Sequence, residues 1–236
     1  MITRYYSMKY ALLPAILLIL FSGCMQDLGK LIEFNGGQLY YTTSVTAEEA
    51  DRLGEFLIES GFYDGERKTV QLTKPGEVYE FRMAVREGVE LDQNYVGSAV
   101  FFVYDLSENV FEGNPVAIHF CDTRMNTLLE ISHMDFNPGG INYTSTVSSE
   151  EANALGEYLS QNGFFDEKDI TVLLSKAGAV FEFRMVVLDG TEENPENLII
   201  LRTFAEEMSE NVFNNRQLDF HLCDDQLGTI QVIEIR

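Results

Sequence analysis

The feature that most constrains the fold of this chain is an internal duplication. The stretch Val45–Asp64 returns as Val147–Asp166, and the match continues at the same spacing of 102 positions, without a gap, over residues 34–131 and 136–233. A period of this length corresponds to a whole domain rather than to a short structural repeat. The sequence therefore predicts two tandem domains of one fold. We call them repeat 1 (residues 31–133) and repeat 2 (residues 134–236).

The duplicated stretch is predicted to be a helix. Thr46 precedes Glu49 by three positions, and Ser148 precedes Glu151 in the same way. This is the pattern of a capping box, in which hydroxyl and carboxylate satisfy the first free N–H groups of a helix. A glycine follows each helix, at positions 61 and 163, where a left-handed residue ends it. Apolar residues recur along one side of each helix, so both helices are expected to lie on a sheet.

The remaining elements follow from apolar alternation and turn residues. In repeat 1 we expect strands at Leu39–Thr43, Thr69–Thr73, Val78–Val85, Val116–Asp122 and Leu128–Ile131. The segment Tyr95–Phe111 is ambiguous alone, but its copy Leu198–Phe213 keeps helical spacing between charged residues, which favours a helix. The order β-α-β-β-α-β-β predicts an α+β fold. Each repeat is expected to be ferredoxin-like, with two helices on one face of an antiparallel sheet.

The sheet face away from the helices is predicted to be polar. Alternation places a glutamate, an arginine, a histidine and a cysteine on this face in each repeat. They are Glu80, Arg82, His119 and Cys121 in repeat 1, and Glu182, Arg184, His221 and Cys223 in repeat 2. In a structural interpretation, the glutamates and arginines form cross-strand ion pairs. In a variant of this interpretation, the two polar faces, or the two fourth strands, meet across a pseudo-twofold axis, so that the polar residues form the interface between the repeats.

A second interpretation of the same face is a zinc site. His119 and Cys121 lie two residues apart on one strand, so their side chains project to the same side about 7 Å apart, and His221 and Cys223 repeat the arrangement. Joined across a twofold axis, two histidines and two cysteines would supply a zinc ligand set. The cysteines could instead form a disulfide. We expect two free, buried thiols in the contact between the repeats, and the alternatives stay open.

No sequence motif indicates catalysis. The chain has no glycine-rich phosphate loop, no HExxH pair and no EF-hand loop. The only nucleophile close to a base in sequence is the cysteine of each His-x-Cys pair, on an extended strand. We therefore expect a non-catalytic binding or scaffolding module without a cofactor, whose protein partner or small ligand is unknown. The alternative class is a metal-binding or thiol-active protein that uses zinc or the cysteines.

The charge of the chain argues against one class of partner. The sequence holds 38 acidic residues against 16 lysines and arginines, a formal net charge of −22. Binding to a phosphate backbone requires clustered cations that displace counterions. The longest basic run is the pair Arg67-Lys68. Nucleic acid is therefore excluded as an expected partner.

The start of the chain predicts its compartment. Arg4 and Lys9 precede the apolar run Ala11–Phe21, which has the length of a signal-peptide core and is too short to span a bilayer. The run ends in Phe21-Ser22-Gly23-Cys24. This motif resembles the lipobox of bacterial lipoproteins, in which the cysteine becomes the lipid-modified first residue of the mature chain.

The resemblance implies a signal peptide of residues 1–23, lipidation of Cys24 and a short lipidated tether of residues 24–30. It implies anchoring to a membrane of the bacterial cell envelope through the lipid. By analogy with the family, Met25 after the cysteine, in place of aspartate, favours the outer membrane in a cell that has one.

Overall fold

The computed structural model describes residues 28–136, 139–165 and 170–236. The predicted signal peptide and Cys24 lie outside these residues. Repeat 1 contains β1 (Lys30–Phe34), β2 (Gly37–Tyr41), α1 (Ala47–Glu59), β3 (Thr69–Thr73), β4 (Tyr79–Ala84), a 3-10 turn (Val89–Leu91), α2 (Gln93–Asn109), β5 (Val116–Cys121) and most of β6 (Thr127–Asp135). Repeat 2 contains β7 (Gly140–Thr144), α3 (Ser149–Gln161), β8 (Val172–Ala177), β9 (Val180–Val186), α4 (Pro195–Asn211), β10 (Leu218–Cys223) and β11 (Thr229–Ile235). None of the helices in these ranges is long and apolar enough to cross a membrane.

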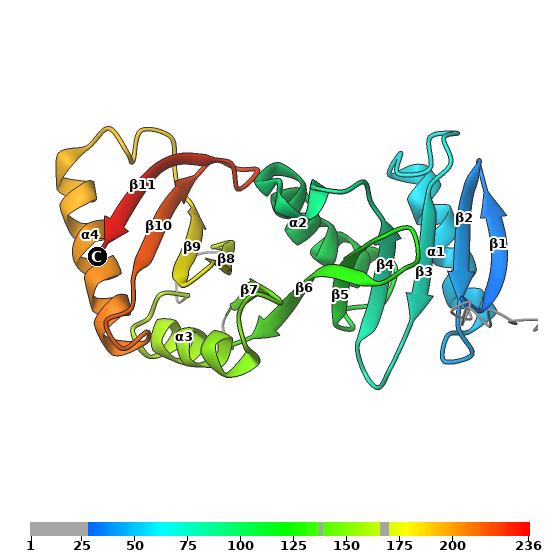
Figure 1. Cartoon of the computed structure of the whole chain (residues 1–236), viewed down its shortest axis with the longest axis horizontal. Helices are drawn as coiled ribbons and strands as arrows, with labels where there is room; N and C mark the ends of the chain where they lie inside the picture. Colours follow the sequence, from blue (N-terminus) through cyan, green and yellow to red (C-terminus); the bar gives the residue numbers. More distant parts are fainter. Residues whose placement is uncertain (1–27, 137–138, 166–169) are drawn as a thin grey trace, which may run out of the picture.

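All strands of the described residues belong to one sheet, and they follow one another in chain order from β1 to β11. Strands joined by a helix are parallel neighbours, namely β2 and β3, β4 and β5, β7 and β8, and β9 and β10. The other neighbouring pairs are antiparallel. The fold is thus α+β with a mostly antiparallel sheet, as expected, and Figure 1 shows the sheet running through both repeats.

The ferredoxin-like strand order is wrong. In that order the last strand of a unit returns to pair with the first, whereas here β5 lies beside β4 and β2 pairs with β1 and β3. Strand β1 was not predicted, because it is short and most of its residues are exposed, so that it lacks a clear apolar alternation. Since β1 occupies the free edge of β2, a returning strand has no edge to join. Alternation predicts which face a side chain takes, but it does not specify the neighbouring strand.

Both helices of repeat 1 cover the same face of the sheet, as predicted. Phe56 of α1 lies 6.0 Å from Phe102 of α2 between ring centroids, and Phe102 contacts Phe81 of β4. The strand pair joined by α1 runs opposite to the pair joined by α2, because β3 and β4 are antiparallel. The connections through α1 and α2 lie on the same face and step in the same direction across the sheet, but their strands run in opposite directions. The two crossovers therefore have opposite handedness. One of them therefore departs from the usual right-handed rule.

The predicted helix signals are confirmed. In α1 the Thr46 hydroxyl accepts from the Glu49 N–H, and the Glu49 carboxylate accepts from the Thr46 N–H. Ser148 and Glu151 form the same box before α3. The glycines that follow, at positions 61 and 163, have φ values of +74° and +68°. The ambiguous segment is helical as α2, as its copy indicated.

Helix α2 has buried or partly buried apolar residues on more than one side, and its position in the fold explains this. One side of α2 packs on the sheet of repeat 1, while Leu173, Cys223 and Leu227 of repeat 2 belong to the same apolar cluster as this helix. A Cβ atom added at Gly97 would lie 2.5 Å from the Gln226 carbonyl oxygen, so the helix and the β10–β11 hairpin are in close contact. Figure 1 shows this hairpin next to α2 in the middle of the molecule. Helix α2 is thus enclosed by both repeats.

Polar contacts fix the same junction. The Asn142 side chain on β7 donates to the Tyr104 hydroxyl of α2 at 3.0 Å, and this hydroxyl lies 3.3 Å from Nδ1 of His133 on β6. Asn142 also donates to the Val172 carbonyl, and it is completely buried. A buried side-chain amide whose two N–H groups both have acceptors fits only one arrangement of its neighbours. The junction is therefore a defined interface.

The repeats are joined head to tail, and the expected pseudo-twofold axis is absent. Strand β1 spans residues 30–34, and the positions equivalent to it by the 102-residue spacing are 132–136, of which 132–135 form the second half of β6. That half pairs with β7 as β1 pairs with β2. The same strand therefore ends repeat 1 and begins repeat 2. The predicted boundary between residues 133 and 134 lies inside it.

Candidate functional site

The polar residues predicted for repeat 1 form a cluster on the face away from α1. The register of β4 and β5 places Arg82 opposite His119. The Arg82 guanidinium lies 3.2 Å from a Glu80 oxygen, and it donates to the Met125 carbonyl at 2.9 Å and to the Thr127 hydroxyl at 3.0 Å. The His119 Nδ1 atom lies 3.2 Å from the same hydroxyl. The β5–β6 hairpin thus closes over the cluster.

Repeat 2 builds the same cluster from the equivalent residues. Arg184 lies 3.5 Å from a Glu182 oxygen and donates to the Thr229 hydroxyl at 2.6 Å. Nδ1 of His221 is 3.0 Å from this hydroxyl, and Ser175 donates to Glu182. In both repeats the ion pair joins residues two apart on one strand, so the expected cross-strand pairing is wrong. Side chains two apart on a strand share a face, which explains the short distance.

The two histidines are buried in a way that keeps them neutral. His119 is 5% exposed and His221 is 8% exposed. Burial lowers the pKa of His119 despite the opposing effect of Glu130 and Glu80, and burial together with Arg184 lowers the pKa of His221 to about 4. Within the described ranges, Nε2 of each ring has no hydrogen-bond partner. The imidazoles are therefore uncharged at neutral pH.

The two cysteines are free, as predicted, and completely buried. Burial raises the pKa of both thiols, so they are protonated at neutral pH and weak nucleophiles. Cys223 packs in the contact with repeat 1, as expected. Cys121 lies instead beside Arg82 and Thr127, on the polar face of repeat 1.

The four side chains of the hypothetical zinc set do not meet. His119 and Cys121 are on β5, whereas His221 and Cys223 are on β10, and four strands lie between them in the sheet. In the part of the chain that the structure describes, no group of three or more histidine, cysteine, aspartate or glutamate side chains is arranged to hold a metal. The head-to-tail junction explains the separation, since equivalent residues stay one repeat apart.

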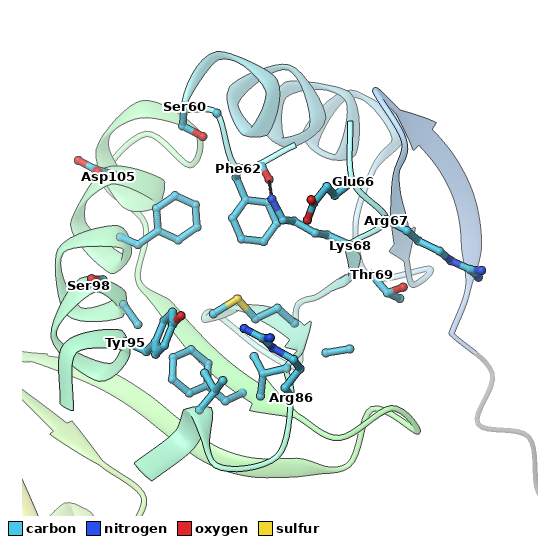
Figure 2. A pocket seen from close by; sticks show the side chains of 18 residues that line it. Ser60, Phe62, Glu66, Arg67, Lys68, Thr69, Arg86, Tyr95, Ser98 and Asp105 are labelled. Carbon is cyan, nitrogen blue, oxygen red and sulfur yellow. Dashed lines mark hydrogen bonds between the residues drawn. The ribbon is translucent and has the colours of Figure 1, made fainter. Parts of the chain in front are cut away.

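A hollow on the helix side of repeat 1 was not predicted (Figure 2). It has a volume of about 890 Å³ and lies between the loop that follows α1, the end of β4 and the first turns of α2. Ligand pockets commonly measure about 300–1,000 Å³. Its apolar lining includes Phe62, Met83, Val85, Phe102 and Phe120. The aromatic part is well ordered by stacking, with 5.9 Å between the Phe62 and Phe102 ring centroids.

Polar groups border this apolar lining. Figure 2 shows Arg86 and the Tyr95 hydroxyl directed into the hollow, while Arg67 and Asp105 point away from its centre. Neither the Arg86 guanidinium nor the Tyr95 hydroxyl has a hydrogen-bond or ion-pair partner among the residues that the structure describes. Lys68, in contrast, donates to the Phe62 carbonyl at 2.7 Å and to Asp64 at 2.6 Å.

The signal that could have revealed the hollow is a difference between the repeats. Repeat 2 has leucine and asparagine, Leu188 and Asn197, at the positions of Arg86 and Tyr95. The apolar lining is kept, with Phe164 and Phe204 at the positions of the stacked rings. The features predicted from the sequence are those that the two copies share. The residues that distinguish this site are those that they do not share.

The fold and this hollow define a class of protein, a chain of two α+β repeats on one sheet with a partly polar pocket in the first repeat. The family is more specific. The model of the AF_1994_N family, which describes the N-terminal domain of that family, matches residues 31–133 and again residues 134–234. The chain belongs to this family and contains its domain twice, which confirms the internal repeat. Searches of curated proteins and of solved structures found no match.

Proposed function

We propose that the protein is a lipid-anchored protein of the bacterial cell envelope that acts as a non-catalytic binding module. The anchor would be Cys24, in the outer membrane where the cell has one, and the binding site would be the hollow of repeat 1. The observation that carries the binding role is this hollow, which combines an apolar lining with two polar groups that have no described partner. Pockets of this composition are typical of ligand sites.

The polar clusters support a structural role for the residues first suspected of chemistry. Their imidazoles are neutral and their thiols protonated, so they offer neither a charged acid nor a thiolate nucleophile. A guanidinium group lies 3.3 Å from Nδ1 of His119, which opposes the binding of a cation there. We therefore propose that the protein uses no cofactor. Zinc remains the alternative, and metal analysis of the purified protein tests it.

The short tether supports a location at the membrane surface. Residues 25–29 separate Cys24 from the first strand. An extended chain of this length spans roughly 20 Å. A lipid on Cys24 would therefore hold repeat 1 close to the bilayer. The high negative charge would keep the protein surface from adhering to anionic headgroups.

Replacing Cys24 tests the anchor. We expect Cys24→Ser to leave the precursor unprocessed or to release the protein from the membrane fraction, because the serine hydroxyl does not accept the lipid. Cys121→Ser is the matched control, since it removes a buried thiol and leaves the lipobox intact. If Cys24→Ser fractionates and migrates on a gel like the wild type, the proposed anchor is wrong.

A further inference from the structure

The hollow of repeat 1 contains groups that select a ligand by charge. Its lining includes Arg67, Lys68 and Arg86, three of the 16 lysines and arginines of a chain with a net charge of −22. Arg67 donates to Gln38 and Lys68 to Asp64, so both are already engaged. Arg86 is exposed and has no partner among the described residues. It is thus the guanidinium available to a ligand.

The surroundings of Arg86 specify the rest of the ligand. The Tyr95 hydroxyl also faces the hollow, and the apolar lining of the same hollow includes Met83, Phe102 and Phe120. An aromatic and thioether surface favours an apolar body. A guanidinium and a hydroxyl that are directed into the same hollow offer several donors to one planar anion, and a carboxylate accepts such donors.

Negative charges near the hollow limit the number of negative charges that its ligand can have. Glu66 and Asp105 also border the hollow, and both are exposed, with Asp105 pointing away from its centre. A ligand with several negative charges would be repelled by these carboxylates and by the overall charge of the chain. A single negative charge held next to Arg86 avoids most of this repulsion.

We propose that this hollow binds a carboxylate with an apolar chain, with its carboxylate on Arg86 and Tyr95 and its chain on the apolar lining. The inference rests on the proposed function and specifies its ligand class. Repeat 2 offers an internal comparison, because Leu188 and Asn197 replace both donors while the stacked phenylalanines remain. The carboxylate preference therefore belongs to repeat 1.

The test is calorimetric titration with three probes that share a chain, namely octanoate, octanol and octylammonium. The protein is the chain from residue 25, which contains every described helix and strand, and its cooperative unfolding is verified first. A charge-assisted hydrogen bond is worth more than about tenfold in affinity. We expect octanoate to bind about tenfold or more tightly than octanol, and octylammonium to bind more weakly than either.

Variants assign the preference to residues. Arg86→Leu should weaken octanoate binding about tenfold or more and leave octanol binding within about twofold, and Tyr95→Phe should weaken octanoate binding about threefold. The matched control is Arg124→Leu, which removes an exposed arginine outside the hollow and should change neither affinity. Equal binding of octanoate and octanol, or an unchanged preference in Arg86→Leu, would overturn the ligand class while the apolar pocket stands. If none of the three probes binds, the binding module itself is refuted.

Discussion

A bulky residue at Gly97 should destabilise the whole chain through the contact between α2 and repeat 2. The substitution is Gly97→Ile, because α4 has Ile199 at the equivalent position and shows that this helix type accepts isoleucine. A Cβ atom at Gly97 would lie 2.5 Å from the backbone oxygen of Gln226 and 3.1 Å from Cβ of Leu227. The further carbons of isoleucine would meet the same hairpin, so α2 and repeat 2 must separate.

The expected change in the free energy of unfolding combines two opposing effects. Overpacking a tight contact costs about 1–3 kcal/mol, and a clash with backbone lies at the upper end. Isoleucine regains roughly 0.5 kcal/mol over glycine in helix propensity. We expect a net loss of about 2–3 kcal/mol in the free energy of unfolding. That is a large part of the roughly 5–15 kcal/mol that a folded protein has in total.

Urea denaturation followed by circular dichroism measures this loss on the chain from residue 25. The matched control is Ile199→Ala, at a side chain that is 67% exposed, and it should change the free energy of unfolding by less than about 0.5 kcal/mol. Propensity alone predicts that Gly97→Ile stabilises the protein slightly. A variant as stable as the wild type would therefore show that α2 does not pack against the β10–β11 hairpin.

Two further predictions concern the polar clusters. The ordinary histidine pKa is 6.5 and that of folded His221 is about 4, so the unfolded chain binds more protons between these values. The contribution of His221 to the free energy of unfolding is then present in full above about pH 6.5. It is lost as the pH falls towards 4, by about 2 kcal/mol at pH 5. Urea midpoints measure this loss, and an identical pH slope in His221→Gln would contradict the prediction. Cys121 and Cys223 should resist alkylation in the folded protein and gain two alkyl groups after unfolding without reductant, as read by mass. Rapid labelling in the native state, or unfolded protein that reacts only after reduction, would contradict this.

The local structure of a repeat could be predicted, because it depends on neighbours in sequence. The capping boxes at Thr46 and Ser148 involve residues three positions apart, so the pattern itself contains the contact. Strand alternation likewise placed Arg82 and His119 on one face, where they lie together. Comparison of the copies also identified α2, whose own composition was ambiguous.

The arrangement of the strands could not be predicted, since the same alternation fits more than one order. Strand β1 was missed because Lys30–Phe34 is short and more than half of its residues are exposed, as suits an edge strand. The length of β6 was underestimated for a related reason. Its second half belongs to the next copy in sequence, and a search within one copy stops at residue 131.

The hollow was missed because it depends on tertiary contacts. Phe62, Met83 and Phe102 come from separate elements, and each fits an ordinary core position. Arg86 and Tyr95 have no feature in sequence that marks them as neighbours. Only the fold brings them to the same apolar surface, and the contrast with repeat 2 then becomes meaningful.

The close approach at Gly97 also limits how an array of such domains can grow. Repeat 2 packs on α2 because that helix has a glycine and apolar residues on its outer side, whereas α4 has Ile199 there, together with the exposed residues Arg202 and Glu206. In solenoid proteins a polar terminal repeat of this kind acts as a cap that stops stacking. A third domain of the same kind could not pack on α4 as repeat 2 packs on α2. A further domain would therefore need a contact different from the one that joins repeats 1 and 2, and α4 forms a polar cap at its end of the pair.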